Sequence, residues 1–185
     1  MKIGFAIIPE ESFLSQIIEL ENEYNKKLQF KHSLGLSKNL PHITLFQGEF
    51  PEDLNYIEIV HLLYEKIKGF HKPLNVEFKK IEYIEKGWFF LVCNKTDSLT
   101  SLHLYLLEYL SEYVILPKDR LDNKEREHLT NLQYEAIVKY NYRYAGDAFF
   151  PHITIGRSLK NNDVVLKEIN NDFMKLNNFS KISRV

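Results

Sequence analysis

The four-residue sequence Pro-His-Ile-Thr occurs twice in this chain, at 41–44 and again at 151–154, and no other feature restricts its fold as much. Each copy lies in an alternating apolar and polar segment, at 40–48 and 149–157, which is typical of a half-buried strand. Side chains alternate between the two faces of a strand, so the His and Thr of each copy share one face and the Ile points to the other. The repeat therefore predicts two strands of the same design in the two halves of the chain.

The rest of the chain alternates between strand and helix patterns. Apolar residues at helical spacing with capping signals predict helices over 12–28, 51–69, 97–113, 129–141 and 161–175. Further strands are expected at 2–8, 74–84, 87–94 and 179–185, with a hairpin turn at 85–87. The charged stretch 117–127 is expected to be an exposed loop. This mixture of elements predicts an α+β fold.

Length, charge and cysteine content narrow the class of protein. The 185 residues predict one domain, 1–185, and a net charge of −1 excludes a strongly basic coat for nucleic acid. The single cysteine, Cys93, excludes an intrachain disulfide and a cysteine-based zinc site. The apolar runs are too short for a signal sequence or a membrane span. We therefore expect a cytoplasmic, monomeric protein with no membrane contact and no obligate protein partner.

The His-x-Thr spacing occurs three times, although chance predicts only about 0.2 such pairs from 7 His and 5 Thr in 185 residues. Two of the pairs are His42 with Thr44 and His152 with Thr154, which belong to the repeated strands. The third lies in the charged segment 123–132, which has helical character, and side chains two positions apart on a helix do not face together. We therefore interpret His128 and Thr130 as surface helix residues without a catalytic role.

Two histidines that converge on one site are suited to phosphodiester cleavage. One takes a proton from the attacking oxygen, and the other gives a proton to the leaving oxygen. Imidazole suits both tasks because its ordinary pKa lies near neutrality. Threonine hydroxyls can donate hydrogen bonds to the non-bridging phosphate oxygens, where charge builds in the transition state. This chemistry requires no metal and no other cofactor.

The two motifs resemble the paired His-x-Thr/Ser signature of the 2H phosphoesterase superfamily. That superfamily includes RNA 2′,3′-cyclic phosphodiesterases, bacterial 2′-5′ RNA ligase proteins and 2′,5′-oligoadenylate phosphodiesterases. The resemblance implies two pseudo-symmetric α+β lobes, whose antiparallel sheets line a central cleft with the helices outside. It also implies His42 and Thr44 from one lobe and His152 and Thr154 from the other, with the two His catalytic and the two Thr binding phosphate. Arg157 stands where many relatives carry a basic residue and is a further candidate for phosphate binding.

Other candidates for substrate contact lie beside the motifs. Lys38 precedes the first motif, and Tyr142, Arg143 and Tyr144 form an aromatic and basic cluster ahead of the second. That cluster could stack a base or belong to the core, and the sequence leaves both readings open. The apolar segment 88–90 is interpreted as core strand. The two motif histidines are 110 residues apart, so 117–140 is a possible insertion that bears on specificity.

The predicted function is therefore that of a metal-independent phosphodiesterase. Its expected substrates are ribonucleotide 2′,3′-cyclic phosphates or 2′,5′-linked (oligo)nucleotides, and the near-neutral charge favours a small nucleotide or short RNA over long duplexes. Two alternatives remain open: cleavage of cyclic nucleotide or oligonucleotide immune signals, and binding of phosphorylated nucleotides without catalysis. A two-histidine metal site is the weakest alternative, because no carboxylate lies at a matched spacing.

Overall fold

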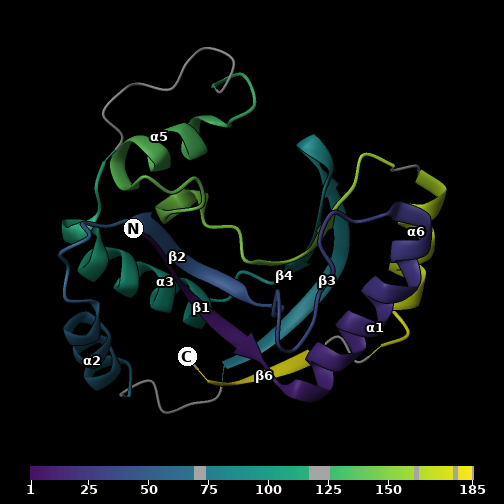
Figure 1. The fold of residues 1–185 in the computed structure, drawn as a ribbon, viewed down its shortest axis with the longest axis horizontal. Coiled ribbons are helices and arrows are strands. Elements are labelled where there is room, and N and C mark those ends of the chain that lie inside the picture. The colour runs from purple at the N-terminus through teal and green to yellow at the C-terminus, as the bar shows by residue number, and fades with distance from the viewer. Residues whose placement is uncertain (69–73, 117–125, 161–162, 177–178, 185) are drawn as a thin grey trace. The chain divides into compact units, whose positions relative to one another are not determined.

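The structure is a computed structural model, and it describes residues 1–68, 74–116, 126–160, 163–176 and 179–184 (Figure 1). Its strands are β1 (Lys2–Pro9), β2 (Ile43–Glu49), β3 (Leu74–Ile84), β4 (Trp88–Cys93), β5 (His152–Arg157) and β6 (Phe179–Arg184). Its helices are α1 (Glu11–Leu28), α2 (Tyr56–Ile67), α3 (Asp97–Leu110), α5 (Asn131–Tyr140) and α6 (Asp163–Phe173). The predicted α+β class is confirmed. None of the helices in these described parts is long and apolar enough to cross a membrane.

The chain divides into two compact units, each built from three separate segments. The first unit comprises Met1–Ala6, Thr44–Lys72 and Thr96–Phe150. The second comprises Ile7–Ile43, Pro73–Lys95 and Pro151–Val185. The boundary crosses β2 directly after Ile43, so the first repeated motif is shared between the two units.

The second unit contains an antiparallel sheet in the strand order β5-β4-β3-β6. The ends of β2 and β1 extend it, because Ile43 pairs with Ile153 and Pro9 pairs with Ile182. The predicted hairpin turn between β3 and β4 is a single 3₁₀ turn at Glu85–Gly87. Gly87 has a φ of +87°, and a Cβ there would lie 2.6 Å from the carbonyl oxygen of Ser158, so this turn requires glycine.

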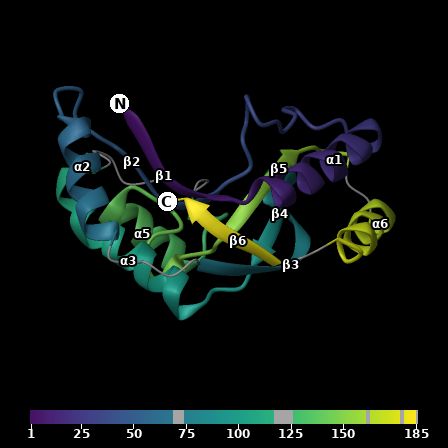
Figure 2. The ribbon, with the colours of Figure 1, turned by 90° about the horizontal axis from the view of Figure 1, so that it is seen from below.

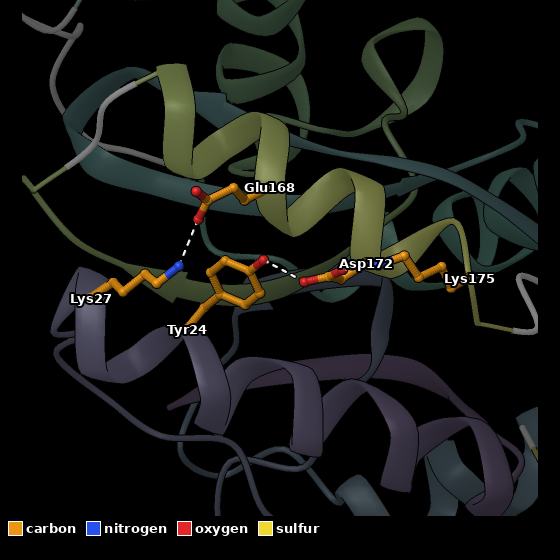
Figure 3. A network of polar contacts seen from close by, with 5 residues as sticks. All are labelled: Tyr24, Lys27, Glu168, Asp172 and Lys175. Carbon is orange, nitrogen blue, oxygen red and sulfur yellow. Dashed lines mark hydrogen bonds and ion pairs between the residues drawn. The ribbon is translucent and has the colours of Figure 1, made fainter.

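Helices α1 and α6 lie side by side in the second unit, as Figures 1 and 2 show. The Tyr24 hydroxyl of α1 donates to Asp172 of α6 at 2.6 Å, and Lys27 pairs with Glu168 at 2.6 Å (Figure 3). The Asn170 amide of α6 exchanges two hydrogen bonds with the backbone of Ile81 in β3. The apolar side of α1 is buried, as its helical spacing predicts. Its buried apolar residues are Phe13, Leu14, Ile17, Leu20, Tyr24 and Leu28.

The first unit is organised around α3, which begins at Asp97 with Thr96 as its N-cap. His103 of α3 is fully buried and uses both ring nitrogens. Its Nδ1 lies 2.6 Å from the Leu45 carbonyl oxygen, and its Nε2 accepts the Gly146 N–H at 2.9 Å. Its ring stacks on Phe149 with centroids 4.0 Å apart. Because a carbonyl can only accept, this arrangement holds the imidazole as its neutral Nδ1–H tautomer.

Several predicted element boundaries shift for local reasons. Helix α2 begins at Tyr56 instead of at 51–53, because the side chain of Asn55 caps the backbone N–H of Glu58. Helix α5 begins at Asn131, with Thr130 as its cap in a reciprocal capping box with Gln133. The interpretation of His128 and Thr130 as helix residues was therefore wrong: His128 is exposed in a turn before the helix. The greater part of the predicted loop 117–127, residues 117–125, lies outside the described residues.

Candidate functional site

The pairing of Ile43 with Ile153 brings the two repeated motifs together on neighbouring antiparallel strands. Continued by one residue, the same register places His42 opposite Thr154. His152 lies two residues before Thr154 on the same face of β5, diagonal to His42. Diagonal neighbours of this kind have their Cα atoms about 7–8 Å apart, within reach of long side chains. The register therefore places the two histidines on the same face of neighbouring strands.

A hollow of about 200 Å³ in the second unit adjoins this face. The segment that links α1 to β2 provides one wall, and strands β4 and β5 provide the other. The loop residues are His32, Leu34, Asn39, Leu40 and His42, and the strand residues are Trp88, Thr154, Ile155, Gly156 and Arg157.

His42 is exposed at this hollow and its ring orientation is fixed. Its Nδ1 lies 2.8 Å from the carbonyl oxygen of Leu40. Because that oxygen can only accept, Nδ1 carries the hydrogen, and in the neutral ring Nε2 carries the lone pair. A hydrogen bond of this kind to a backbone carbonyl sets the tautomer of a histidine that must accept a proton at Nε2.

His152 is half-buried and stacks on Phe90 of β4, with ring centroids 3.9 Å apart and planes at 25°. The residue before it, Pro151, is held from β4 as well. Its carbonyl oxygen accepts the backbone N–H of Cys93 at 3.2 Å and the Cys93 thiol at 3.3 Å. Burial raises the pKa of that thiol to about 12, so Cys93 is a neutral donor that fixes the start of β5.

A β-bulge in β5 turns Arg157 toward the face that carries His152 and Thr154. Phe90 of β4 pairs with Thr154, whereas Phe89 pairs with Gly156, so Ile155 is an extra residue between the two pairs. An extra residue shifts the alternation of side chains that follow it. Arg157 accordingly lies opposite Trp88, with its guanidinium 5.3 Å from the centre of the indole ring.

The loop between α1 and β2 is fastened by several polar contacts. Asn25 of α1 accepts the Phe30 N–H at 2.7 Å and donates to the Ser33 hydroxyl at 3.2 Å. Lys31 donates its N–H to the Arg157 carbonyl at 3.0 Å, which joins the loop to β5. The carboxylate of Glu21 is fully buried and accepts the Leu34 N–H at 3.4 Å. Burial raises the pKa of Glu21, although that hydrogen bond opposes the shift.

The structure does not bring every predicted residue to this hollow. The resemblance implied one motif from each lobe, but His42, His152 and Thr154 all belong to the second unit and only Thr44 belongs to the first. The reason is that β2 pairs with β5 at Ile43, directly before the boundary. Of the predicted residues, His42, Thr154 and Arg157 line the hollow, whereas His152, Thr44 and the exposed Lys38 do not.

The predicted aromatic and basic cluster belongs to the first unit. Tyr142 and Tyr144 are 4% and 8% exposed, and burial raises the pKa of both hydroxyls. The ring of Tyr142 packs edge-on against Phe46, with centroids 6.0 Å apart. The Arg143 guanidinium lies 5.0 Å over the Tyr144 ring and donates to Gln133. Both tyrosine rings are thus core residues.

Two residues of the hollow, His32 and Trp88, were missed as site candidates. Trp88 begins a run of six apolar residues, which reads as buried strand throughout. Only the strand register, which places it opposite Arg157, distinguishes Trp88 from its neighbours. His32 lies in a polar loop and belongs to no motif.

Comparison with models of known protein families and with curated proteins found no match for this chain. Within the described part of the chain, no three His, Cys, Asp or Glu side chains gather as ligands for a metal ion would.

Proposed function

We propose that the protein is a metal-independent phosphodiesterase of the 2H phosphoesterase type. Its proposed substrates are ribonucleotide 2′,3′-cyclic phosphates or 2′,5′-linked (oligo)nucleotides. The observation that carries this proposal is the register of β2 and β5, which sets His42 opposite Thr154 and diagonal to His152. A repeated motif whose two copies meet on one face supports a shared task for the two histidines.

In the proposed reaction on a 2′,3′-cyclic phosphate, a water oxygen attacks phosphorus and one ribose P–O bond breaks. We assign the base to His42, because the Leu40 carbonyl holds its Nδ1 hydrogen and leaves Nε2 to take the proton of the water. His152, protonated, gives its proton to the departing ribose oxygen. Thr154 donates a hydrogen bond to a non-bridging phosphate oxygen, and Thr44 is proposed for the same task.

Positive charge near the phosphate would assist this reaction. Arg157 lines the same hollow as His42 and is half-buried, so its guanidinium can stabilise the charge of a bound phosphate. We further propose that the enzyme acts as a cytoplasmic monomer on a small nucleotide or short RNA. A measurement of its molar mass in solution would test the monomeric state.

The decisive experiment is an activity screen in the presence of EDTA. The panel contains 2′,3′-cyclic, 2′,5′-linked and 3′,5′-linked substrates and cyclic dinucleotides. We expect turnover of the first two classes by the unaltered protein and its loss in His42→Ala and His152→Ala. His128→Ala is the matched control, because His128 does not line the hollow, and this variant should turn over the substrates as the unaltered protein does.

Other results would redirect or reject the proposal. Turnover of cyclic dinucleotides alone would favour an immune-signal nuclease, and nucleotide binding without turnover would favour a binding protein. Inhibition by EDTA that zinc or manganese reverses would favour a metal site. Full activity of the doubly substituted protein, with both motif histidines changed to alanine, would leave the repeated motif with a structural role only.

A further inference from the structure

We propose that Trp88 and Arg157 form the surface on which the nucleobase of the substrate stacks, beside the phosphate held by His42 and Thr154. This inference rests on the proposed function, since it names the part of the nucleotide that the second wall of the hollow binds. It predicts that the enzyme prefers a substrate whose terminal nucleotide carries a purine. It gives Arg157 a second task besides any contact with phosphate.

Trp88 departs from the pattern of its own strand. Every other residue of β4 is buried, and Phe89 is fully so, whereas the indole of Trp88 is half-exposed at the hollow. The indole contacts Phe90 and the Arg157 guanidinium, and the exposure of the rest of this large apolar ring to water is unfavourable. An aromatic ring placed beside the proposed phosphate site is a natural surface for a base, because every base has a π-face.

The guanidinium of Arg157 lies over this indole. Its Nε donates to the Lys86 carbonyl at 2.8 Å, while the guanidinium carbon lies 5.3 Å from the indole centre. These two contacts restrict the conformations of the Arg157 side chain. Bases stack on guanidinium planes as well as on aromatic rings, so the pair offers a continuous surface.

The distance from this surface to the proposed phosphate site suits a single nucleotide. Trp88 pairs with Arg157, and Phe90 pairs with Thr154. Along the strands, Trp88 and Thr154 are therefore separated by one step of two residues on their shared face. That step is about 7 Å. The ribose of one nucleotide bridges such a span between its phosphate and its base.

The remaining walls also suit a base. Leu34, Leu40 and Ile155 provide apolar contacts, and Asn39 provides a polar group for a base edge. The hollow of about 200 Å³ is smaller than the ~300–1,000 Å³ of ordinary ligand pockets, so it is too small for more than one nucleotide. A purine gains more than a pyrimidine because its stacking area is larger.

The protein contains a built-in probe for this contact, because Trp88 is its only tryptophan. Adenosine 2′-monophosphate should quench the intrinsic tryptophan fluorescence in a saturable way, and cytidine 2′-monophosphate should bind more weakly. Inorganic phosphate and ribose 5-phosphate should leave the emission nearly unchanged. This measurement needs no turnover, so it stays informative if the proposed activity is absent.

Variants separate base binding from phosphate binding. By calorimetry, Trp88→Leu should weaken the binding of adenosine 2′-monophosphate about 5- to 150-fold, the range that loss of one base stack represents. Trp88→Phe should retain part of the affinity, and both should bind inorganic phosphate as the unaltered protein does. Arg157→Lys keeps the positive charge and loses the planar guanidinium, so it should weaken the binding of the purine nucleotide more than that of phosphate. Tyr64→Leu, which removes an exposed aromatic ring of the first unit, is the matched control.

The kinetic counterpart compares adenosine 2′,3′-cyclic phosphate with ribose 2′,3′-cyclic phosphate, which lacks the base. Trp88→Leu should raise KM for the first and leave KM for the second unchanged, with kcat little altered. Equal effects on both substrates, or no quenching by adenosine 2′-monophosphate, would overturn the stacking surface. Saturable purine quenching in a protein that turns over nothing on the panel would instead reject the proposed function and keep the stacking surface.

Discussion

Ile43 of β2 lies opposite Ile153 of β5, and this single antiparallel pair places the two copies of Pro-His-Ile-Thr beside each other. Both isoleucines are fully buried, so the pair is fixed by packing on the core face of the sheet. A slip of one residue would turn the histidines into the core, which the burial of isoleucine opposes. The apolar half of each motif thus sets the position of its polar half.

The first prediction concerns the paired histidines. His42→Ala and His152→Ala should each lower kcat by ~10²–10⁴, the usual contribution of one positioned acid or base. The doubly substituted protein should lose far less than the product of the two single losses, because the two groups act as a unit. Steady-state kinetics with a 2′,3′-cyclic nucleotide measures this. Strictly multiplicative losses would argue that the two residues act independently.

The second prediction concerns the dependence of kcat/KM on pH. The base must be deprotonated, so the rate should fall at low pH, and the acid must be protonated, so the rate should also fall at high pH. His42→Ala should remove the acidic limb, and His152→Ala should remove the basic limb. The rates of the variants will be low, so a sensitive fluorogenic substrate is required. A profile that keeps both limbs in both variants would assign the titration to other groups.

The two motif strands could be predicted from sequence because they depend on local alternation. In each motif an apolar isoleucine, Ile43 or Ile153, stands between a histidine and a threonine, and this pattern is sufficient to predict a strand. The bulge at Ile155 could not be predicted, because an extra residue in one strand is visible only when its partner strand is known. The capping role of Thr130 depends on its reciprocal hydrogen bonds with Gln133 and has no connection with the His-x-Thr spacing.

A third prediction tests the buried imidazole of the first unit. His103→Ala should lower the free energy of unfolding by about 2–4 kcal/mol, because it removes two hydrogen bonds and a stacked ring and leaves a cavity. Denaturation by urea, followed by circular dichroism, measures the change. His128→Ala, at an exposed turn, should shift the same quantity by less than about 0.5 kcal/mol. Similar values for both variants would contradict the assigned role of the His103 hydrogen bonds.

A fourth prediction concerns the close approach of Phe30 to β5. A Cβ at Gly156 would lie 2.5 Å from Cδ1 of Phe30, which is packed edge-on against Phe89. Gly156→Ala should therefore destabilise the protein by about 1–3 kcal/mol through overpacking. Adding Phe30→Leu should recover part of that loss, and the double-mutant cycle would measure the coupling. Simple additivity of the two changes would show that the phenylalanine is not the obstacle.

The last prediction follows from the raised pKa of Glu21. A carboxyl group whose pKa is higher in the folded state than in the unfolded chain binds more protons when folded, so its favourable contribution is complete at pH values below the unfolded pKa. That contribution is lost as the pH rises through the folded value. Glu21→Gln cannot titrate, so the free energy of unfolding of the unaltered protein should fall relative to that of the variant as the pH rises above the ordinary carboxyl range. Any fixed difference from the new amide cancels in this comparison, and Glu19→Gln, on the exposed side of the same helix, should show a smaller pH-dependent difference. If the difference between the unaltered protein and Glu21→Gln were constant with pH, or ran in the opposite direction, the carboxylate of Glu21 would not be the buried group described here.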